Sequence, residues 1–309
     1  MKEVNPASLV SDERFSAMTI DVEDGVSIWM RDLFGKEMAP TGRVVDNMEV
    51  LLGLFAEHGL RATFFILGEI AAEYPSLVRQ IASGGHEIGV HGYNHDQIFK
   101  LTPERAREDI HRARDLMEQV SGQPVYGFRA PAFSVSEQTR WVLDIIAELG
   151  FRYDSSIIPV RTKRYGWPGF ERGIHRMELP GGNSLIEVPL SVDRVLGRTL
   201  PACGGGYLRY FPYALTRRSF RRIRMDRPVI VYLHPYELDN RKYPDYFYDA
   251  KKGLGLRQRI PLTFYRLNKG TVKGKLTNLI QEFPFKPIIE IIDDNERSSE
   301  IPETRLQAT

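Results

Sequence analysis

Short apolar segments alternate with amphipathic helical segments through the first two-thirds of this 309-residue chain, and this alternation constrains the fold most. The apolar segments have the length of buried strands, and the segments between them carry apolar residues at helical spacing. Strands are predicted at 17–20, 60–67, 86–90 and 125–129, and helices at 44–58, 75–82, 102–120 and 137–149. Repeated strand–helix units of this kind favour a parallel sheet with right-handed crossovers, either open or closed into a barrel.

The second part of the chain is less regular. After a stretch rich in glycine, proline and arginine, strands are predicted at 185–189 and 228–234, with a basic helix between them at 213–223. A helix at 272–281, a short apolar segment at 288–292 and a frayed end at 295–309 follow. We therefore divide the chain into an N-terminal extension (1–16), a barrel (17–239) and a basic C-terminal extension that packs on the barrel (240–309).

Composition excludes several classes of protein. Hydrophobic residues make up 42% of the chain and charged residues 27%, which is typical of a globular protein rather than a disordered or fibrous one. Cys203 is the single cysteine, so neither an internal disulfide nor a cysteine-based zinc site is expected. The apolar runs are too short to span a bilayer, and the first residues lack the apolar core of a secretory signal. We therefore expect a cytoplasmic protein.

Positive charge is concentrated in the second half of the chain. Between residues 201 and 280 there are 17 Lys and Arg against 5 Asp and Glu, although the net charge of the whole chain is only +2. Five arginines fall within eight residues: Arg217, Arg218, Arg221, Arg222 and Arg224. This helix presents either a solvated face or a face for an anionic partner, such as the inner membrane surface. No nucleic-acid-binding motif accompanies the charge, so no nucleic-acid partner is expected.

Residues able to bind a metal or to transfer protons follow the predicted strands. Asp21, Glu23 and Asp24 come after the first strand, and three neighbouring carboxylates at a buried strand end require a cation or shared protons. His91 and His95 come after the third strand, at a spacing that lets both bind one metal from one face of a helical turn. Because the carboxyl ends of parallel strands meet at one edge of the sheet, these side chains are expected to lie together.

Two further residues end later strands. Arg129 can hold a carboxylate in a bidentate pair, and His234 is suited to act as a general acid. Taken singly, each motif also has an ordinary explanation: an acidic turn, two unrelated surface histidines, a loop arginine or a packed core histidine. Their coincidence at four strand ends favours a hydrolytic site with imidazole and carboxylate ligands for a metal.

This order of motifs resembles the metal-dependent polysaccharide deacetylases, the family-four carbohydrate esterases. The similarity covers about residues 19–237. It includes the acidic motif, the HxxxH pair, an Arg-x-Pro motif and a late strand-end histidine, and also the segments Phe64-Phe65, Gly85 to Gly89 and Tyr153 to Ser156. The glycines at 204–206 and the stretch from His234 to Glu237 are similar to a branch associated with bacterial exopolysaccharide and surface-glycan biosynthesis.

The resemblance implies a distorted (β/α)7-type barrel that hydrolyses an N-acetyl group on an amino sugar. It implies that Arg129 pairs with the catalytic base and that the backbone N–H of Ala132 contacts the oxyanion. It also implies that His234 protonates the leaving amine, with Asp154 as the residue that orients it. The implied cofactor is one divalent metal, with zinc expected first and cobalt, manganese or iron as alternatives.

The acidic motif leaves two assignments for the base and for the carboxylate that joins the two histidines at the metal. An alignment on Gly25 makes Glu23 the base and Asp24 the metal ligand. An alignment on the strand end makes Asp21 the base and Glu23 the ligand, because residues i and i+2 of a strand point the same way. We favour the second assignment and keep Asp24 as the second candidate for the ligand.

Two other functions are alternatives. One is a metal-free relative that hydrolyses a ureide or a cyclic imide, against which the intact HxxxH pair argues. The other is a non-catalytic barrel that binds glycans, against which the complete set of catalytic residue types argues. The expected partner is an acetylated amino-sugar glycan or precursor, and a lipid-carrier-linked precursor at the inner membrane face would suit the basic second half.

Overall fold

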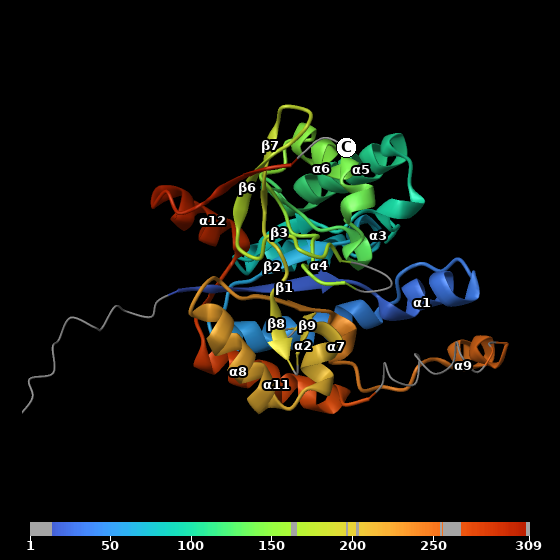
Figure 1. The fold of residues 1–309 in the computed structure, drawn as a ribbon. Coiled ribbons are helices and arrows are strands. Elements are labelled where there is room, and N and C mark those ends of the chain that lie inside the picture. Colours follow the sequence, from blue (N-terminus) through green and yellow to red (C-terminus); the bar gives the residue numbers. More distant parts are fainter. Residues whose placement is uncertain are drawn as a thin grey trace, which may run out of the picture.

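In the described part of the chain, seven parallel strands form the centre of the molecule, as the strand–helix alternation predicts. Figure 1 shows helices packed around this central sheet. The computed structural model describes residues 14–161, 166–195, 197–201, 204–253, 255 and 267–306. The parallel strands are β1 (Ser16–Val22), β2 (Thr63–Ile66), β3 (Glu87–Val90), β4 (Gly127–Phe128), β5 (Tyr153–Asp154), β7 (Ser184–Glu187) and β10 (Ile230–Leu233). They lie in the order β10-β1-β2-β3-β4-β5-β7. This is a barrel-like α/β fold of the (β/α)7 type, which confirms the predicted fold class.

Helices connect the consecutive strands of the first half. They are α1 (Gly25–Phe34) and α2 (Arg43–Glu57) after β1, α3 (Gly68–Glu73) and α4 (Pro75–Ser83) after β2, α5 (Pro103–Ser121) after β3, and α6 (Trp141–Glu148) after β4. The termini of α5 carry the predicted signals. Thr102 accepts a hydrogen bond from the backbone N–H of Arg105 at 3.4 Å, and Gly122 ends the helix with φ of 71°. The short helices α1 and α3 are the ones that the sequence pattern does not predict.

The second part of the chain adds elements on both sides of these strands. Strand β6 (His175–Glu178) pairs antiparallel with β7, and β8 (Val192–Val195) forms a separate two-stranded sheet with β9 (Arg198–Pro201). The helices here are α7 (Gly205–Tyr210), α8 (Tyr213–Arg224), α9 (Asp245–Lys252) and α11 (Val272–Glu282). Helices α8 and α11 correspond to the predicted helices at 213–223 and 272–281.

The C-terminal segment returns to the central sheet. Strand β11 (Phe285–Lys286) pairs with the start of β1, and β12 (Glu303–Arg305) pairs with β6 after helix α12 (Ile288–Arg297). The prediction of a frayed end from residue 295 is therefore wrong for the residues described up to 306. The polar sequence of β12 carries no strand signal of its own, and it forms a strand because β6 offers an edge with hydrogen-bonding groups to pair.

The basic helix α8 uses several of its arginines for packing. Arg217 and Arg221 contact Glu282 of α11, and Arg222 contacts Asp193 of β8. These pairs hold α8 against the rest of the molecule, so they account for part of the charge excess. Contact of this helix with an anionic surface stays a prediction. Within the described ranges, no helix combines the length and the apolar character needed to cross a membrane.

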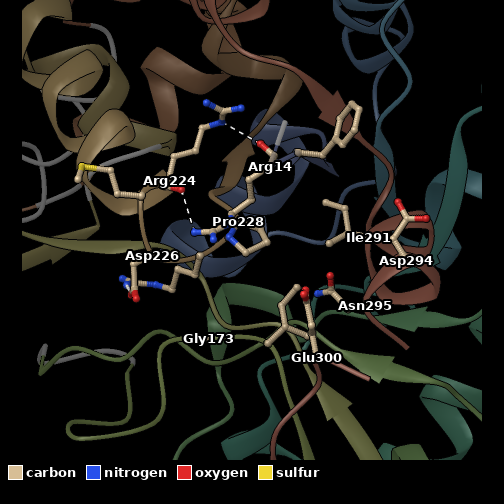
Figure 2. Close-up of a pocket in the computed structure, with 13 residues that line it drawn as sticks. Arg14, Gly173, Arg224, Asp226, Pro228, Ile291, Asp294, Asn295 and Glu300 are labelled. Atoms are coloured by element: carbon tan, nitrogen blue, oxygen red, sulfur yellow. Dashed lines mark hydrogen bonds and ion pairs between the residues drawn. The ribbon is translucent and has the colours of Figure 1, made fainter. Parts of the chain in front are cut away.

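A cavity of about 850 Å³ lies at the amino ends of two central strands (Figure 2). Its lining includes Phe15, directly before β1, and Pro228, two residues before β10. Charges of both signs surround it, among them Arg227 and Glu300. It is therefore distinct from the predicted site, which belongs at the carboxyl ends of the strands.

His86, directly before β3, is buried as a neutral ring. Its Nδ1 accepts the backbone N–H of Ala62 at 3.2 Å, and its ring contacts the Phe64 ring with centroids 4.9 Å apart. Burial, with a smaller effect from the charge of Arg61, lowers the pKa of His86 to about 4. Protonation therefore favours the unfolded chain, in which a histidine has a pKa near 6.5.

We expect His86 to lower the free energy of unfolding by about 2 kcal/mol between pH 8 and pH 5, because its folded-state pKa is below its unfolded value. Chemical denaturation of the wild type and of His86→Gln over this pH range measures the effect. The glutamine can still accept the Ala62 N–H but does not titrate, so the difference between the two proteins should change with pH. A constant difference would contradict the assignment.

Candidate active site

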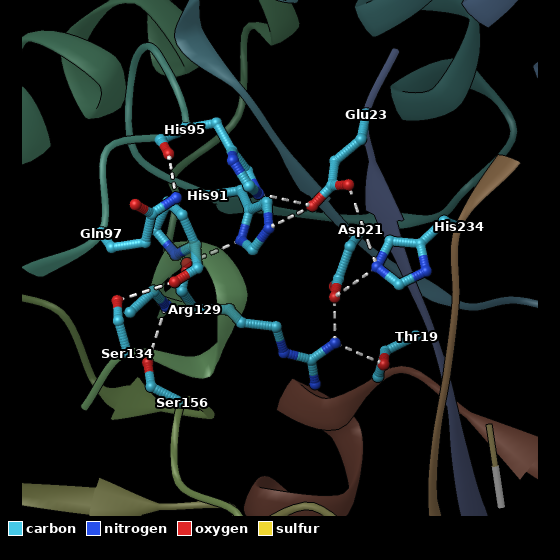
Figure 3. Close-up of polar contacts among 12 residues, drawn as sticks. Thr19, Asp21, Glu23, His91, His95, Gln97, Arg129, Ser134, Ser156 and His234 are labelled. Carbon is cyan, nitrogen blue, oxygen red and sulfur yellow. Dashed lines mark hydrogen bonds and ion pairs between the residues drawn. The ribbon is translucent and has the colours of Figure 1, made fainter. Parts of the chain in front are cut away.

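The residues predicted at four strand ends converge at the carboxyl edge of the sheet (Figure 3). Asp21 lies on β1 and Glu23 directly follows it, while His91, Arg129 and His234 follow β3, β4 and β10. Strand β1 lies between β10 and β2, so residues more than 200 positions apart become neighbours. The alternation of a strand points the side chains of Asp21 and Glu23 the same way.

Glu23 and the two histidines of the HxxxH motif form one buried cluster. Oε1 of Glu23 is 3.0 Å from Nε2 of His91 and 3.1 Å from Nε2 of His95. One ligand atom from each residue lies within 4.8 Å of the others. One carboxylate and two imidazoles are a donor set that zinc and other first-row divalent metals accept.

The hydrogen bonding of His91 fits a cation at this cluster. Nδ1 of His91 donates to the backbone carbonyl of Arg129 at 2.8 Å, which assigns the proton of a neutral ring to Nδ1. The lone pair of Nε2 then faces the Glu23 carboxylate at 3.0 Å, and two acceptors at this distance repel each other unless a positive charge lies between them. A backbone carbonyl that fixes the tautomer in this way is a common partner of metal-binding histidines.

Neighbouring charges outweigh burial in setting the pKa values of Glu23 and His234. Burial alone raises the pKa of Glu23, but the charges of His95 and His234 and the close contacts of both motif histidines lower it well below its usual value. Burial lowers the pKa of His234, whereas the carboxylates of Glu23, Glu237 and Asp21 raise it to about 9. In both groups the net shift of the pKa favours the ionised form, even in this buried setting.

The two histidines lie on a loop, so the prediction that they share a helical turn is wrong. Gly92 and His95 have φ of 75° and 66°, and these left-handed residues turn the chain sharply. The Asp109 carboxylate on α5 accepts the backbone N–H of Tyr93 at 2.9 Å and so holds the loop. The i, i+4 spacing brings the rings of His91 and His95 together through this turn, with centroids 5.9 Å apart.

Asp24 does not join the histidines. Its carboxylate accepts the backbone N–H groups of Val26 and Ser27 at 3.4 and 3.3 Å and that of Thr41 at 2.7 Å. It is therefore the N-cap of α1, a role that the sequence reading missed together with the helix itself. This geometry supports Glu23 as the ligand and Asp21 as the base.

Arg129 holds Asp21 in place. Nη1 of Arg129 donates to Oδ1 of Asp21 and to Oγ1 of Thr19, both at 2.7 Å, and the arginine side chain is fully buried. Nε and Nη2 donate to the carbonyl and the hydroxyl of Ser155 at 3.0 and 2.9 Å. Oδ2 of Asp21 is 3.9 Å from Nε2 of His234. Thr19 was not predicted, although its position two residues before Asp21 on β1 was a usable signal.

Asp154 does not take the predicted place beside His234. Its carboxylate accepts hydrogen bonds from the backbone N–H and the hydroxyl of Ser156, and it lies beside the buried Glu187. Burial raises the pKa of both carboxyl groups, that of Glu187 well above its usual value. The hydroxyl of Ser156 in turn accepts the N–H of Ala130, so Asp154 supports the loop after β4.

The carboxylate beside Nδ1 of His234 belongs to Glu237, which the sequence reading did not assign. Ala132, the other predicted residue of the loop after β4, is exposed and has φ of 53°. Pro131 brings this loop against the histidine loop, since a Cβ at Gly92 would lie 3.2 Å from its ring. Contact of the Ala132 N–H with an oxyanion stays a prediction.

Comparison with known families agrees with this arrangement. Residues 37–153 match the family model described as polysaccharide deacetylase. The chain contains a polysaccharide deacetylase domain. Residues 155–293 match a second model, a domain of unknown function designated DUF3473. The deacetylase match includes both histidines and Arg129, the second match includes His234, and Asp21 and Glu23 precede both.

Curated relatives of the deacetylase domain include two with named substrates. The peptidoglycan-N-acetylglucosamine deacetylase of Bacillus cereus is 29% identical over 111 residues, which are 36% of this chain and 38% of the relative. The chitooligosaccharide deacetylase of Azorhizobium caulinodans is 35% identical over 100 residues, 32% of this chain and 46% of the relative. The chain therefore spans less than half the length of either relative.

Solved structures show the same fold over nearly the whole chain. A crystal structure from Mycobacterium smegmatis, described as a polysaccharide deacetylase, has a TM-score of 0.66 at 19% identity and covers 100% of this chain and 99% of that one. The PuuE allantoinase structure has a TM-score of 0.59 at 15% identity, covering 94% and 93%. The deacetylase domain thus has a fold that occurs with more than one chemistry, and the function must be argued from the site.

Proposed function

We propose that this protein is a metal-dependent hydrolase that removes the N-acetyl group from an amino sugar of a glycan or glycan precursor. The observation that carries the proposal is the convergence of a buried Glu23–His91–His95 cluster with the Arg129-held carboxylate of Asp21. The named relatives act on acetylated glycans, peptidoglycan and chitooligosaccharide, which supports this class of substrate.

Asp21 is the general base in this proposal. Arg129 occupies its Oδ1 and leaves Oδ2 on the side of His234, where it can accept a proton from the attacking water. Both side chains are buried, so the orientation of the carboxylate is fixed before the substrate binds. A base held in this way requires no rearrangement during the reaction.

Glu23, His91 and His95 hold the divalent cation. When bound, such a cation lowers the pKa of water and polarises the amide carbonyl of the substrate. The second oxygen of Glu23, Oε2, is 3.9 Å from Nε2 of His234. The proposed metal ligands and the proposed acid are therefore neighbours in one site.

His234 is the general acid. Nε2 faces Asp21 and Glu23, and it is placed to give a proton to the amine of the sugar as the C–N bond breaks. The ring of Tyr236 stacks on His234 at a centroid distance of 4.8 Å and an angle of 15°, which restricts rotation of the imidazole. The branch in exopolysaccharide synthesis and a lipid-carrier-linked substrate are finer proposals that rest on sequence motifs and charge alone.

The test of this function is the release of acetate. Purified protein loaded with Zn²⁺ is incubated with an N-acetylglucosamine oligomer, and acetate and new free amines are measured. We expect equal amounts of both, with loss of turnover when a chelator removes the metal. A parallel assay with allantoin tests the ureide alternative suggested by the shared allantoinase fold. Hydrolysis of allantoin, or no acetate from any acetylated amino sugar at full metal occupancy, would overturn the proposal.

A further inference from the structure

One buried carboxylate lies beside the nitrogen of His234 that faces away from the metal cluster. Oε2 of Glu237 is 3.7 Å from Nδ1 of His234, and it also accepts the backbone N–H of the same histidine at 3.2 Å. The glutamate ends the short 3₁₀ turn Pro235–Glu237 that directly follows the histidine. Because its side chain is only 1% exposed, little solvent screens its charge from the ring.

Arg209 holds this carboxylate from the other side. Its Nε is 3.4 Å from Oε1 of Glu237, and the arginine side chain is 3% exposed. The pair joins helix α7 to the turn after β10, two segments 28 positions apart. The buried guanidinium next to Oε1 leaves Oε2 as the glutamate oxygen that points to the histidine.

A second cation supports the same turn without reaching the imidazole nitrogens. Nζ of Lys269 donates to the backbone carbonyl of Tyr236 at 2.7 Å, and the ring of Tyr236 is the one stacked on His234. Lys269 therefore contributes to the position of the turn, whereas the Glu237 carboxylate is the charged group that faces Nδ1, at 3.7 Å.

We propose that Glu237, held by Arg209, is the positioning residue for His234. The proposal rests on the proposed function, since it assigns the partner of the proposed acid. A carboxylate at Nδ1 places a proton there and turns Nε2 toward the space beside Asp21. This is the role that the sequence resemblance gives to Asp154, whose carboxylate instead serves Ser156 and the loop after β4.

Glu237 could have a purely structural role, as the cap that accepts the His234 backbone N–H. Substitution by glutamine separates this capping role from the role of its charge beside Nδ1. The amide oxygen of glutamine can still accept the His234 N–H, so the turn keeps its cap while the negative charge beside Nδ1 is lost. Glu237→Gln by itself removes the carboxylate that faces the buried Arg209 guanidinium, which is destabilising. The informative variant is therefore the double substitution Arg209→Met with Glu237→Gln.

We expect the double variant to bind zinc with wild-type stoichiometry but to lower kcat for acetate release from an N-acetylglucosamine oligomer by about 10²-fold. KM should stay within about twofold, because the proposed metal ligands and Asp21 are untouched. The control Lys286→Met, which breaks the ion pair of Lys286 with Asp294, should leave kcat near the wild-type value, because Lys286 lies on β11 beside the start of β1. Wild-type kcat in the folded double variant would show that Glu237 only caps its turn.

The ring nitrogens of His234 give a second readout that needs no turnover. In the zinc-loaded wild type, at a pH at which the His234 ring is neutral, ¹⁵N NMR of labelled histidine, assigned with His234→Gln, should show the single ring proton on Nδ1, and the double variant should lose this preference. A bare Nδ1 in the wild type would overturn the proposal, even if the variants fail to fold. If the wild type releases no acetate, the proposed function fails, and this spectrum still decides the Glu237 contact.

Discussion

His91→Ala and His95→Ala are expected to lose both the bound divalent ion and the release of acetate. Nε2 of His91 and Nε2 of His95 lie 3.0 and 3.1 Å from Oε1 of Glu23. Removal of either ring therefore leaves only two of the three proposed ligands. A bound metal supplies several kcal/mol of transition-state stabilisation, and its loss should lower kcat by at least about 10³-fold. Metal analysis and acetate release on the same samples measure the two effects.

The matched control for this experiment is His111→Ala. His111 lies on α5, its side chain is 59% exposed, and it contacts Asp115. Unlike His91 and His95, it does not belong to the buried cluster. Its substitution should leave metal stoichiometry and kcat unchanged. Full metal occupancy in both His91→Ala and His95→Ala would remove this cluster as the metal site, whatever happened to the activity.

Asp21→Asn is expected to separate the base from the ligands. Metal content should stay near the wild-type value, because Asp21 is held by Arg129 rather than by the histidines. The asparagine cannot accept the proton of the attacking water, so kcat should fall by about 10²–10⁴-fold, the usual contribution of a positioned general base. Glu23→Gln should show the opposite pattern, with loss of the metal.

Asp24→Asn serves as the control for the acidic motif. Asparagine is also an effective N-cap of α1, so both metal content and kcat should stay near the wild-type values. If Asp24→Asn lost the metal and Glu23→Gln lost only kcat, the alternative alignment on Gly25 would be correct. The three variants therefore assign the whole motif from two measurements.

The location of the site could be predicted from the sequence because it depends on strand ends. Apolar runs mark the strands, and the residue that follows a run in a parallel sheet lies at the carboxyl edge whatever the details of the connection. Asp21, His91, Arg129 and His234 were found in this way. The choice between Glu23 and Asp24 also had a local basis, since the i, i+2 alternation of β1 points Asp21 and Glu23 the same way.

The orientation of the supporting side chains could not be predicted in the same way. Glu237 meets His234 within one turn, but its ion pair with Arg209 depends on the tertiary packing of α7 against that turn. Asp154 lies in the segment that the family resemblance singles out, yet the neighbouring Ser156 and Glu187 decide where its carboxylate points. Pairings such as that of β12 with β6 likewise depend on an available edge more than on the sequence of the strand itself.

The position of β10 beside β1 has a consequence for the order in which the protein is made. The acidic residues, both histidines and Arg129 have all been synthesised by residue 129, whereas the proposed acid arrives more than 100 residues later. Strand β1 must then accept β10 on its open side, with Ile20 opposite Leu233, before His234 reaches the site. The ligands of the proposed cation site thus precede the proposed acid in the order of synthesis. In the proposed function, the acid therefore reaches the site only once β10 has docked beside β1.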